Sequence, residues 1–282
     1  MKLRKPVNII RGREGTDGAG VKLIRLFSHD NTNDFDPFLM MDAFDSVDPE
    51  DYNKGFPWHP HRGIETITYL IDGAIEHQDS LGNFGAINAG DAQWMTAGSG
   101  IIHNEMPVES KRMRGFQLWL NLPKQHKMTS PSYNEIKEHS IPVVKEGKNT
   151  IRIISGNYGN KMGAFDPKYV NPLFLDISLS KNSKFELSTP SSDTLFVYIL
   201  EGDVSFSDSE DAIAHKNVVF FGKGDTLRAN SVTTNARILL FSAKPIKEPV
   251  AWAGPIVMNT EAELELAFSQ LRRGTFVQDN HK

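Results

Sequence analysis

The chain has 282 residues, a formal net charge of −4 at pH 7 and no cysteine, which excludes disulfides and thiolate metal ligands. Its densest basic spots, Lys111–Arg114 and Arg272–Arg273, are too short to indicate direct nucleic-acid binding. The first residues lack the apolar core of a secretion signal and no apolar run is long enough to span a bilayer, so we expect a cytoplasmic protein that does not bind membranes.

The first half of the chain is predicted to form short strands separated by glycine turns. Residues 65–71 run into Asp72-Gly73 and resume at Ala74, which is typical of a β-hairpin. Strands are expected, in chain order, over 21–27, 65–71, 74–77, 92–96, 101–106 and 116–122. Short strands with turns about every ten residues predict an all-β barrel or sandwich.

Two short pairs of metal-ligand residue types lie in the stretch from Phe56 to Pro107. One is His59-Pro60-His61 and the other is His103-Asn104-Glu105. Side chains at positions i and i+2 of a strand leave the same face, so each pair can aim both of its members at one point. Three imidazole nitrogens and one carboxylate predict a metal site. The remaining histidines are expected to be ordinary surface or core residues: His29, His77, His126, His139, His215 and His281.

The second half of the chain repeats the first. Residues 194–202 match residues 65–73, and Gly224-Asp225 matches Gly90-Asp91. Two copies of one β-unit account for the length, so we predict two tandem barrels with the division near residue 145.

The N-terminal barrel is accordingly expected over 1–145 and the C-terminal barrel over 146–282. The polar stretch 124–149 is interpreted as their connection, with a little helix at 134–138. A capping box of Thr260 and Glu263 predicts a short helix near the chain end that stops at Gly274.

The second copy is predicted to bind no metal. The same offsets place Ser188 and Pro190 at the positions of His59 and His61, and they place Arg237 and Leu239 at the positions of His103 and Glu105. None of the four replacements is a plausible metal ligand, so the second barrel is expected to be structural or to shape access to the first.

Several longer motifs resemble the pirin family of bicupins, within the cupin superfamily. They are His-Pro-His-Arg-Gly-Ile-Glu-Thr at 59–66, Trp-Met-Thr-Ala-Gly-Ser-Gly-Ile-Ile-His-Asn-Glu at 94–105, Gln-Leu-Trp-Leu-Asn-Leu-Pro at 117–123, and the segments 248–251 and 254–260. Asn104 stands where this family commonly has Ser, at a position that points away from the metal. The resemblance covers most of the chain.

The resemblance implies two double-stranded β-helix barrels and one metal, usually iron, in the N-terminal barrel. It implies His59, His61, His103 and Glu105 as the ligands. Fe(II) is the expected ion, and Mn, Ni, Cu or Zn also suit nitrogen and carboxylate donors. Glu65 shares the face of His61, but four residues of regular strand span ~13 Å, so it is a ligand only if Gly63 bends the backbone. We therefore expect Glu65 to support the site or to form a buried salt bridge with Arg62 or another cation.

Two functions from different classes follow from the resemblance. One is oxygenolytic cleavage of flavonols such as quercetin, with the flavonol and dioxygen as substrates and Glu105 as the catalytic proton acceptor. The alternative is a non-enzymatic regulatory or redox-sensing protein that binds a protein partner. We favour the dioxygenase. A sugar-phosphate isomerase is disfavoured, because only Arg62 lies near the motif to hold a phosphate. The candidate pocket walls are Phe56, Trp58, Ile67, Tyr69, Met95 and Phe116.

Overall fold

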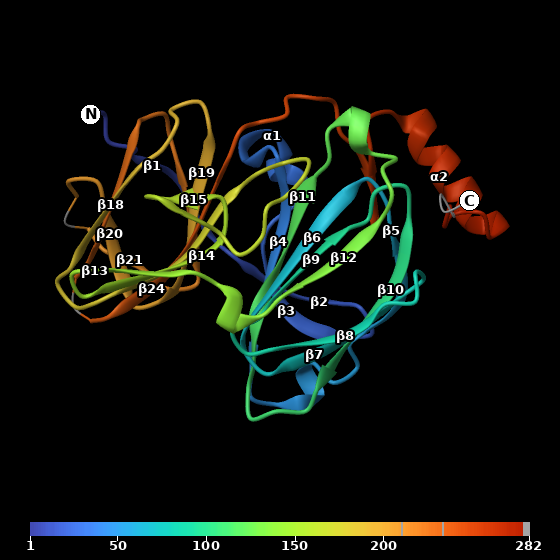
Figure 1. Cartoon of the computed structure of the whole chain (residues 1–282), viewed down its shortest axis with the longest axis horizontal. Coiled ribbons are helices and arrows are strands. Elements are labelled where there is room, and N and C mark those ends of the chain that lie inside the picture. Colours follow the sequence, from blue (N-terminus) through green and yellow to red (C-terminus); the bar gives the residue numbers. More distant parts are fainter. Residues whose placement is uncertain (210, 233, 279–282) are drawn as a thin grey trace. The chain divides into compact units, whose positions relative to one another are not determined.

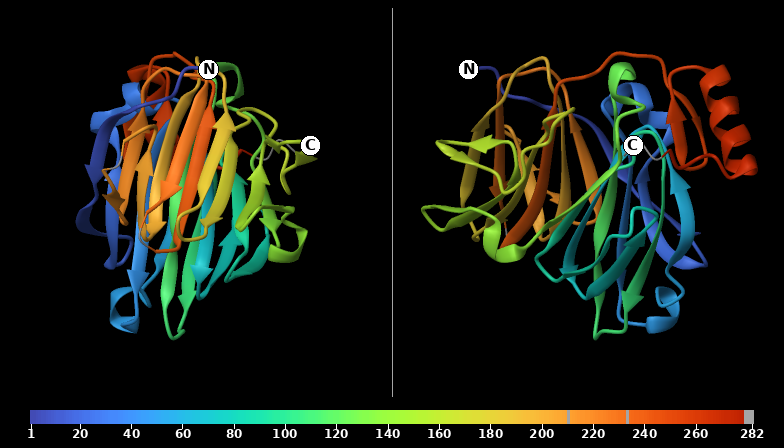
Figure 2. Two further views of the ribbon diagram at one scale, coloured as in Figure 1. Left: turned by 90° about the vertical axis from the view of Figure 1, so that its left-hand side faces the viewer. Right: turned by 45° about the vertical axis from the view of Figure 1, so that its right-hand side comes forward.

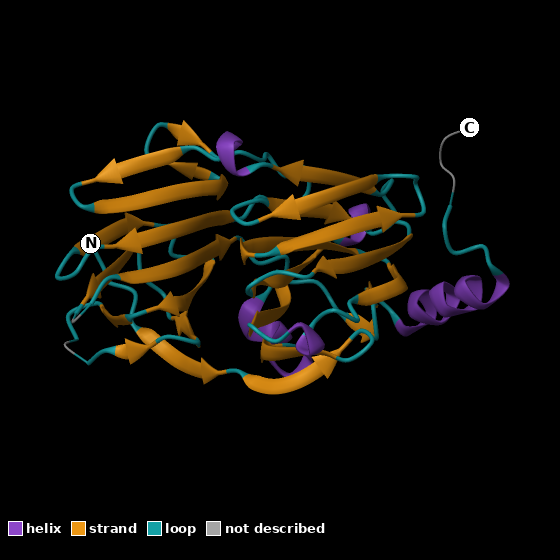
Figure 3. Ribbon diagram, turned by 90° about the horizontal axis from the view of Figure 1, so that it is seen from below, coloured by secondary structure: helices purple, strands orange, loops and turns teal. Residues whose placement is uncertain are grey.

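The computed structural model describes residues 1–209, 211–232 and 234–278, so His281 lies outside the described residues. It confirms an all-β protein with two cupin barrels, each built from one seven-stranded and one four-stranded antiparallel sheet (Figures 1 and 3). None of the helices formed by the described residues is long and apolar enough to cross a membrane.

The N-terminal barrel holds both pairs of candidate ligands. Its seven-stranded sheet has the order β12 (Ser132–Ile136), β9 (Ala92–Thr96), β6 (Ile64–Asp72), β11 (Met113–Asn121), β4 (Phe38–Ser46), β3 (Val21–Phe27) and β2 (Arg13–Asp17). Its four-stranded sheet has the order β5 (Phe56–His61), β10 (Ile101–Val108), β7 (Ala74–Asp79) and β8 (Phe84–Asn88). Two short strands, β25 (Ala251–Ala253) and β26 (Ile256–Met258), and the helix α2 (Glu261–Arg273) complete it.

The C-terminal barrel has the same strand arrangement, and its strands run side by side in the left view of Figure 2. The larger sheet has the order β1 (Pro6–Arg11), β22 (Asn217–Phe221), β19 (Thr194–Glu201), β24 (Ala236–Ala243), β17 (Leu173–Leu179), β14 (Asn149–Ser155) and β13 (Val143–Glu146). The smaller sheet has the order β18 (Lys184–Ser188), β23 (Thr226–Ser231), β20 (Asp203–Phe206) and β21 (Ile213–Ala214). The remaining short elements are β15 (Asn157–Tyr158), β16 (Lys161–Met162) and α1 (Thr32–Phe35).

The chain forms two compact units, and each unit combines three segments that are separated in the sequence. Residues 13–33, 37–138 and 246–278 form the N-terminal barrel, and residues 1–12, 34–36 and 139–245 form the C-terminal barrel. These units differ from a single division at residue 145 because β1 pairs with β22, while Ile256 bridges to Arg62. Of the residues predicted to form a little helix, 134–136 belong to the strand β12, which pairs with β9, and a 3-10 turn begins only at Glu138.

The matching strand orders identify which positions of the second barrel correspond to the candidate ligands. Leu187 faces Leu227 as His59 faces His103, and Ala229 faces Phe206 as Glu105 faces His77. The predicted equivalents were wrong: Ser188 and Pro190 are exposed and one residue out of register, and Arg237 and Leu239 lie on β24, which corresponds to β11. Phe206, Leu227 and Ala229 belong to the apolar core of the C-terminal barrel, and the partly buried Leu187 packs against it.

The C-terminal helix begins and ends where the sequence predicted. The side chain of Thr260 accepts a hydrogen bond from the backbone of Glu263, whose carboxylate accepts one from the Thr260 backbone. Gly274 ends the helix in the left-handed conformation with φ of 70°. The helix packs beside β25 and β26, as the right view of Figure 2 shows, and this segment supplies part of the wall of the candidate site.

A buried lysine fixes the turn between β5 and β6. The amino group of Lys127 donates to the carbonyl oxygens of Gly63 and Val257, at 2.8 and 2.9 Å, and to Oδ1 of Asn121 at 2.5 Å. Gly63 has φ of +76°, and a Cβ there would lie 1.9 Å from the Val257 oxygen, so only glycine fits. This anchor holds the backbone that carries His61.

We expect Lys127→Met to lower the free energy of unfolding by about 3 kcal/mol, because the substitution leaves buried acceptors without a donor. Urea unfolding of the parent and the variant measures this difference. Lys124→Met is the matched control, since Lys124 is exposed in the same turn. Equal losses in the two variants would contradict the anchoring role.

Candidate metal centre

The pairing of β5 with β10 gathers three histidines on one face of the small sheet. His59 lies directly opposite His103, and His61 lies opposite Ile101. One ring nitrogen from each of the three histidines lies within 4.8 Å of the others. The ring centroids of His59 and His103 are 4.2 Å apart, and those of His61 and His103 are 5.0 Å apart. The structure therefore brings together three of the four predicted ligands.

The free nitrogens of this cluster suit a metal ion. Nδ1 of His59 donates to the Pro57 carbonyl at 2.9 Å, and Nδ1 of His61 donates to the Pro255 carbonyl at 3.3 Å. Since a carbonyl oxygen only accepts, both rings keep their proton on Nδ1 and present an Nε2 lone pair. Nε2 of His61 and Nε2 of His103 are buried without a hydrogen-bond partner. Such nitrogens without a hydrogen-bond partner are suitable ligands for a divalent transition metal ion.

Burial favours the neutral form of His61 and His103, which metal ligation requires. It lowers the pKa of His61 well below its usual value, and the neighbouring His59 adds to the effect. It likewise lowers the pKa of His103, with further contributions from His61, His59 and His77. Neutral rings keep their lone pairs available for an ion.

Glu105 lies in an adjoining cluster that shares His103. Its carboxylate accepts hydrogen bonds from Gln117 at 2.9 Å, from Gln93 at 3.2 Å and from Thr68 at 3.4 Å. One of its oxygens lies within 4.8 Å of ring nitrogens of His77 and His103. The carboxylate is thus held by three donors at the edge of the three-histidine cluster.

His77 is a residue of this site that the sequence reading assigned to the ordinary histidines. It is fully buried on β7, where it faces Glu105, while Asp79 faces His103. Nε2 of His77 lies 3.3 Å from Oδ2 of Asp79. Burial alone would raise the pKa of Asp79, but hydrogen bonds from His77 and Asn83 lower it. The i, i+2 spacing of His77 and Asp79 on a predicted strand is the signal that could have found this pair.

A cavity of about 570 Å³ opens onto the cluster. His59, His61 and Glu105 line it together with Thr68 and Gln117. Its apolar wall is formed by Leu23, Met40, Phe44, Phe56, Ile75, Trp119 and Trp252.

Of the predicted wall residues, Phe56 alone lies among these lining residues. Trp58 is 54% exposed, and Met95 is buried in the core. Ile67, Tyr69 and Phe116 leave the opposite faces of β6 and β11 from Thr68 and Gln117, because neighbouring residues of a strand alternate.

Two tryptophans give the cavity flat aromatic surfaces. Trp119 meets His61 edge-on with ring centroids 5.0 Å apart, and its Nε1 donates to Oε1 of Gln117 at 3.1 Å. That bond turns the amide nitrogen of Gln117 towards Glu105. Trp252 stacks on His29 with centroids 3.6 Å apart, so His29, which was expected to be an ordinary surface or core histidine, also lines the cavity.

The arginines near the site are already engaged. Arg25 lines the cavity, where it binds both carboxylate oxygens of Asp42, at 2.9 and 2.7 Å, and Asp17 at 2.8 Å. Arg62 points away to Gln270 and the Phe276 carbonyl, at 2.6 and 2.8 Å, and burial lowers its pKa to about 10. Neither offers the free cationic cluster that a phosphate substrate would need.

Glu65 lies outside the three-histidine cluster. It is buried, and it accepts a hydrogen bond from the Thr96 hydroxyl at 2.7 Å. Among the described residues, no ion pair joins it to Arg62, so that expectation was wrong. Burial raises the pKa of Glu65 to about 7, although the hydrogen bond from Thr96 opposes the shift.

Comparison with known proteins places this chain in a family. The family described as Pirin matches residues 20–120, and the one described as Pirin C-terminal cupin domain matches residues 174–277. A pirin-like protein of Caulobacter vibrioides is 43% identical over 280 residues, which cover 98% of this chain and 100% of the relative. The chain belongs to the pirin family.

Solved structures of related proteins have the same fold as this pirin. A quercetin 2,3-dioxygenase from Acinetobacter baumannii superposes with a TM-score of 0.89 at 32% identity, covering 97% of this chain and 98% of that one. The bacterial pirin YhhW from Escherichia coli, solved in complex with nickel(II), superposes with a TM-score of 0.68 at 18% identity. The match covers 84% of this chain and 99% of the YhhW chain. At that identity YhhW shares the fold alone.

We expect Glu65→Gln to leave the metal content unchanged and to alter the pH dependence of stability. Between pH 4.5 and about 7 folded Glu65 keeps a proton that the unfolded chain has released, so the parent loses stability as pH rises through this window. The variant lacks this loss and should gain about 3 kcal/mol relative to the parent.

Urea unfolding at several pH values, with Glu76→Gln on an exposed position of β7 as control, measures the difference. A stability difference that does not vary with pH, or loss of metal in Glu65→Gln, would contradict the structural role of Glu65.

Proposed function

We propose that this pirin is a metal-dependent dioxygenase that cleaves flavonols such as quercetin. The observation that carries the proposal is the set of three clustered imidazoles beside an aromatic-walled cavity of about 570 Å³, which suits a flat ligand of several rings. The similarity to a protein solved as a quercetin 2,3-dioxygenase supports the same reaction class.

Within this proposal His59, His61 and His103 hold one Fe(II) ion, and Glu105 is the fourth ligand. Mn, Ni, Cu and Zn are compatible with the same nitrogen and carboxylate donors. The bound ion supplies a positive charge that makes a flavonol hydroxyl more acidic.

The residues of the chain supply position and a proton acceptor. Trp119 and Trp252 offer flat surfaces against which the flavonol rings stack. Glu105 borders the cavity and accepts the hydroxyl proton of the substrate. Gln93 and Gln117 donate to different oxygens of that carboxylate, so its plane is fixed before the substrate arrives.

We expect one transition ion per chain in the parent and a large loss in His61→Ala and His103→Ala, because each substitution removes a ligand. Elemental analysis after gel filtration measures the content. His215→Ala, at an exposed position of the C-terminal barrel, should keep the parent value. Unchanged content in both ligand variants would rule this site out.

We expect Glu105→Gln to slow quercetin cleavage by about 10²–10⁴-fold while keeping part of the metal, since the amide oxygen still coordinates but no longer accepts a proton. Oxygen uptake and carbon monoxide release measure the rate. Glu109→Gln, at an exposed position just beyond β10, is the control.

The same assay decides between catalysis and regulation. Parent protein reconstituted in turn with iron, manganese, nickel and copper should release carbon monoxide with at least one metal, whereas metal-free protein should not. Absence of release with all four would reject the enzyme proposal and favour the regulatory protein that binds a partner.

A further inference from the structure

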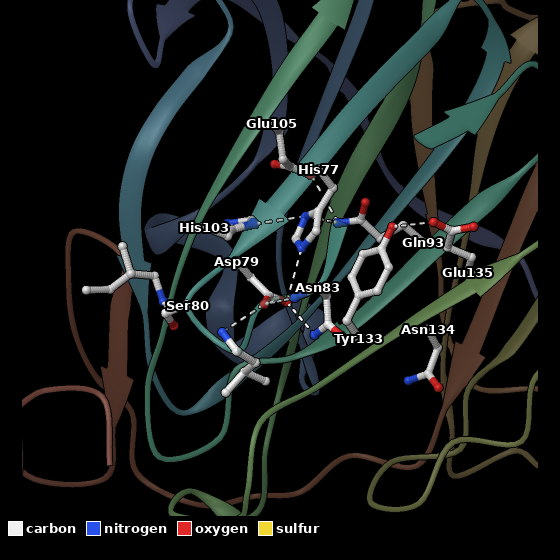
Figure 4. Close-up of polar contacts among 12 residues, drawn as sticks. His77, Asp79, Ser80, Asn83, Gln93, His103, Glu105, Tyr133, Asn134 and Glu135 are labelled. Carbon is white, nitrogen blue, oxygen red and sulfur yellow. Dashed lines mark hydrogen bonds and ion pairs between the residues drawn. The ribbon is translucent and has the colours of Figure 1, made fainter. Parts of the chain in front are cut away.

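The proton on His103 is controlled differently from the protons on the other two histidines. His59 and His61 are fixed by backbone carbonyls, which can only accept. Nδ1 of His103 instead lies 3.4 Å from Nδ1 of His77 (Figure 4). An imidazole nitrogen either donates or accepts, so this contact alone leaves the tautomer of His103 open.

The tautomer is decided one residue further away, at Asp79. Its Oδ1 accepts from the backbone amides of Leu81 and Asn83, at 2.9 and 3.1 Å, and its Oδ2 accepts from the Asn83 side chain at 2.8 Å. An ionised carboxylate has no proton to give, so Nε2 of His77, 3.3 Å from Oδ2, must be the donor. With its proton on Nε2, His77 offers Nδ1 as an acceptor, so the proton between the two rings belongs to His103.

We propose that Asp79 and His77 are positioning residues that keep the proton of His103 on Nδ1, so that its Nε2 lone pair faces His59 and His61. The inference rests on the metal site proposed above. Tyr133 stacks on His77 with centroids 4.2 Å apart and planes 17° apart, which fixes the plane of the ring. All three members of the Asp79–His77–His103 chain are buried, so water does not compete for these bonds.

The side chain of Gln93 lies between His77 and Glu105, so it connects these hydrogen-bonded residues with Glu105. Nε2 of Gln93 lies 3.4 Å from Nδ1 of His77 and 3.2 Å from Oε1 of Glu105, and it donates to Glu105 (Figure 4). The Gln93 amide thus fills the space that a second ion would need among His77, His103 and Glu105. One ion, and not two, is expected per chain.

Asp79→Asn is the sharpest test, because it changes one atom. The Asn oxygen can keep the backbone bonds of Leu81 and Asn83, which turns its amide group towards Nε2 of His77. That nitrogen must then accept, the proton of His77 moves to Nδ1, and His103 is driven to carry its proton on Nε2. Long-range ¹H–¹⁵N correlation spectra of histidine-labelled, metal-free protein report which nitrogen of His103 is protonated. We expect Nδ1 in the parent and Nε2 in the variant.

Metal affinity provides the second readout. Competition titration with nickel(II) should show a 10–100-fold weaker affinity in Asp79→Asn, the usual cost of losing a partner of a ligating histidine. His77→Phe keeps an aromatic ring against Tyr133 and should lose a similar factor. Adding Asp79→Asn to His77→Phe should not weaken nickel affinity further, because Phe at position 77 already removes the hydrogen bonds that connect Asp79 with His103. Asn83→Ala, which removes a donor to Asp79 without touching His77, is the matched control and should keep the parent tautomer.

A proton on Nε2 of His103 in the parent, an unchanged tautomer in Asp79→Asn, or two nickel ions per chain would overturn the inference. Additive affinity losses in the double variant would do the same. Because the tautomer is read without metal or substrate, a failure to cleave quercetin would reject the proposed function and leave this inference intact.

Discussion

The antiparallel register of β5, β10 and β7 is the constraint on which the candidate site depends. β10 is the middle strand of the three, so His103 lies between His59 on one side and Asp79 on the other, and Glu105 lies opposite His77. A slip of one residue would turn the ligand side chains to the other face of the sheet. β5 is an edge strand, which explains why Pro60, without an amide proton, is tolerated between two candidate ligands. The turn that follows is fixed by Lys127 and Gly63.

Burial gives this register its chemical consequence. His61 and His103 are buried, which favours the neutral imidazole, and each Nδ1 of the three rings has a partner while the Nε2 atoms of His61 and His103 have none. A buried ring nitrogen without a hydrogen-bond partner lowers the stability of the folded protein, so its presence here needs an explanation other than stability. In the C-terminal barrel the corresponding positions carry Leu187, Leu227 and Ala229, which close that core with apolar side chains. The two barrels thus share one architecture and differ in what fills its centre.

Features encoded over short distances could be predicted from the sequence. The paired ligand types stood out by their i, i+2 spacing, the duplication was visible by matching 65–73 with 194–202, and the capping box located α2. Features that depend on long-range packing could not. β1 and β12 occupy equivalent edges of their sheets although they lie far apart in sequence. Both faces of β6 are buried, so alternation of polarity does not reveal which face lines the cavity, and Ile67 and Tyr69 were placed on the wrong one.

Anomalous diffraction from crystals of the metal-loaded protein is the most direct test of whether one ion binds at Nε2 of His59, His61 and His103. Data collected on both sides of the metal absorption edge locate the ion without assumptions about the ligands. We expect a single anomalous peak about 2.0–2.2 Å from these three nitrogens, with Asp79 and His77 still bonded behind His103. A peak in the C-terminal barrel, a peak on Nδ1 of His77, or no peak after saturation with a transition metal would contradict it.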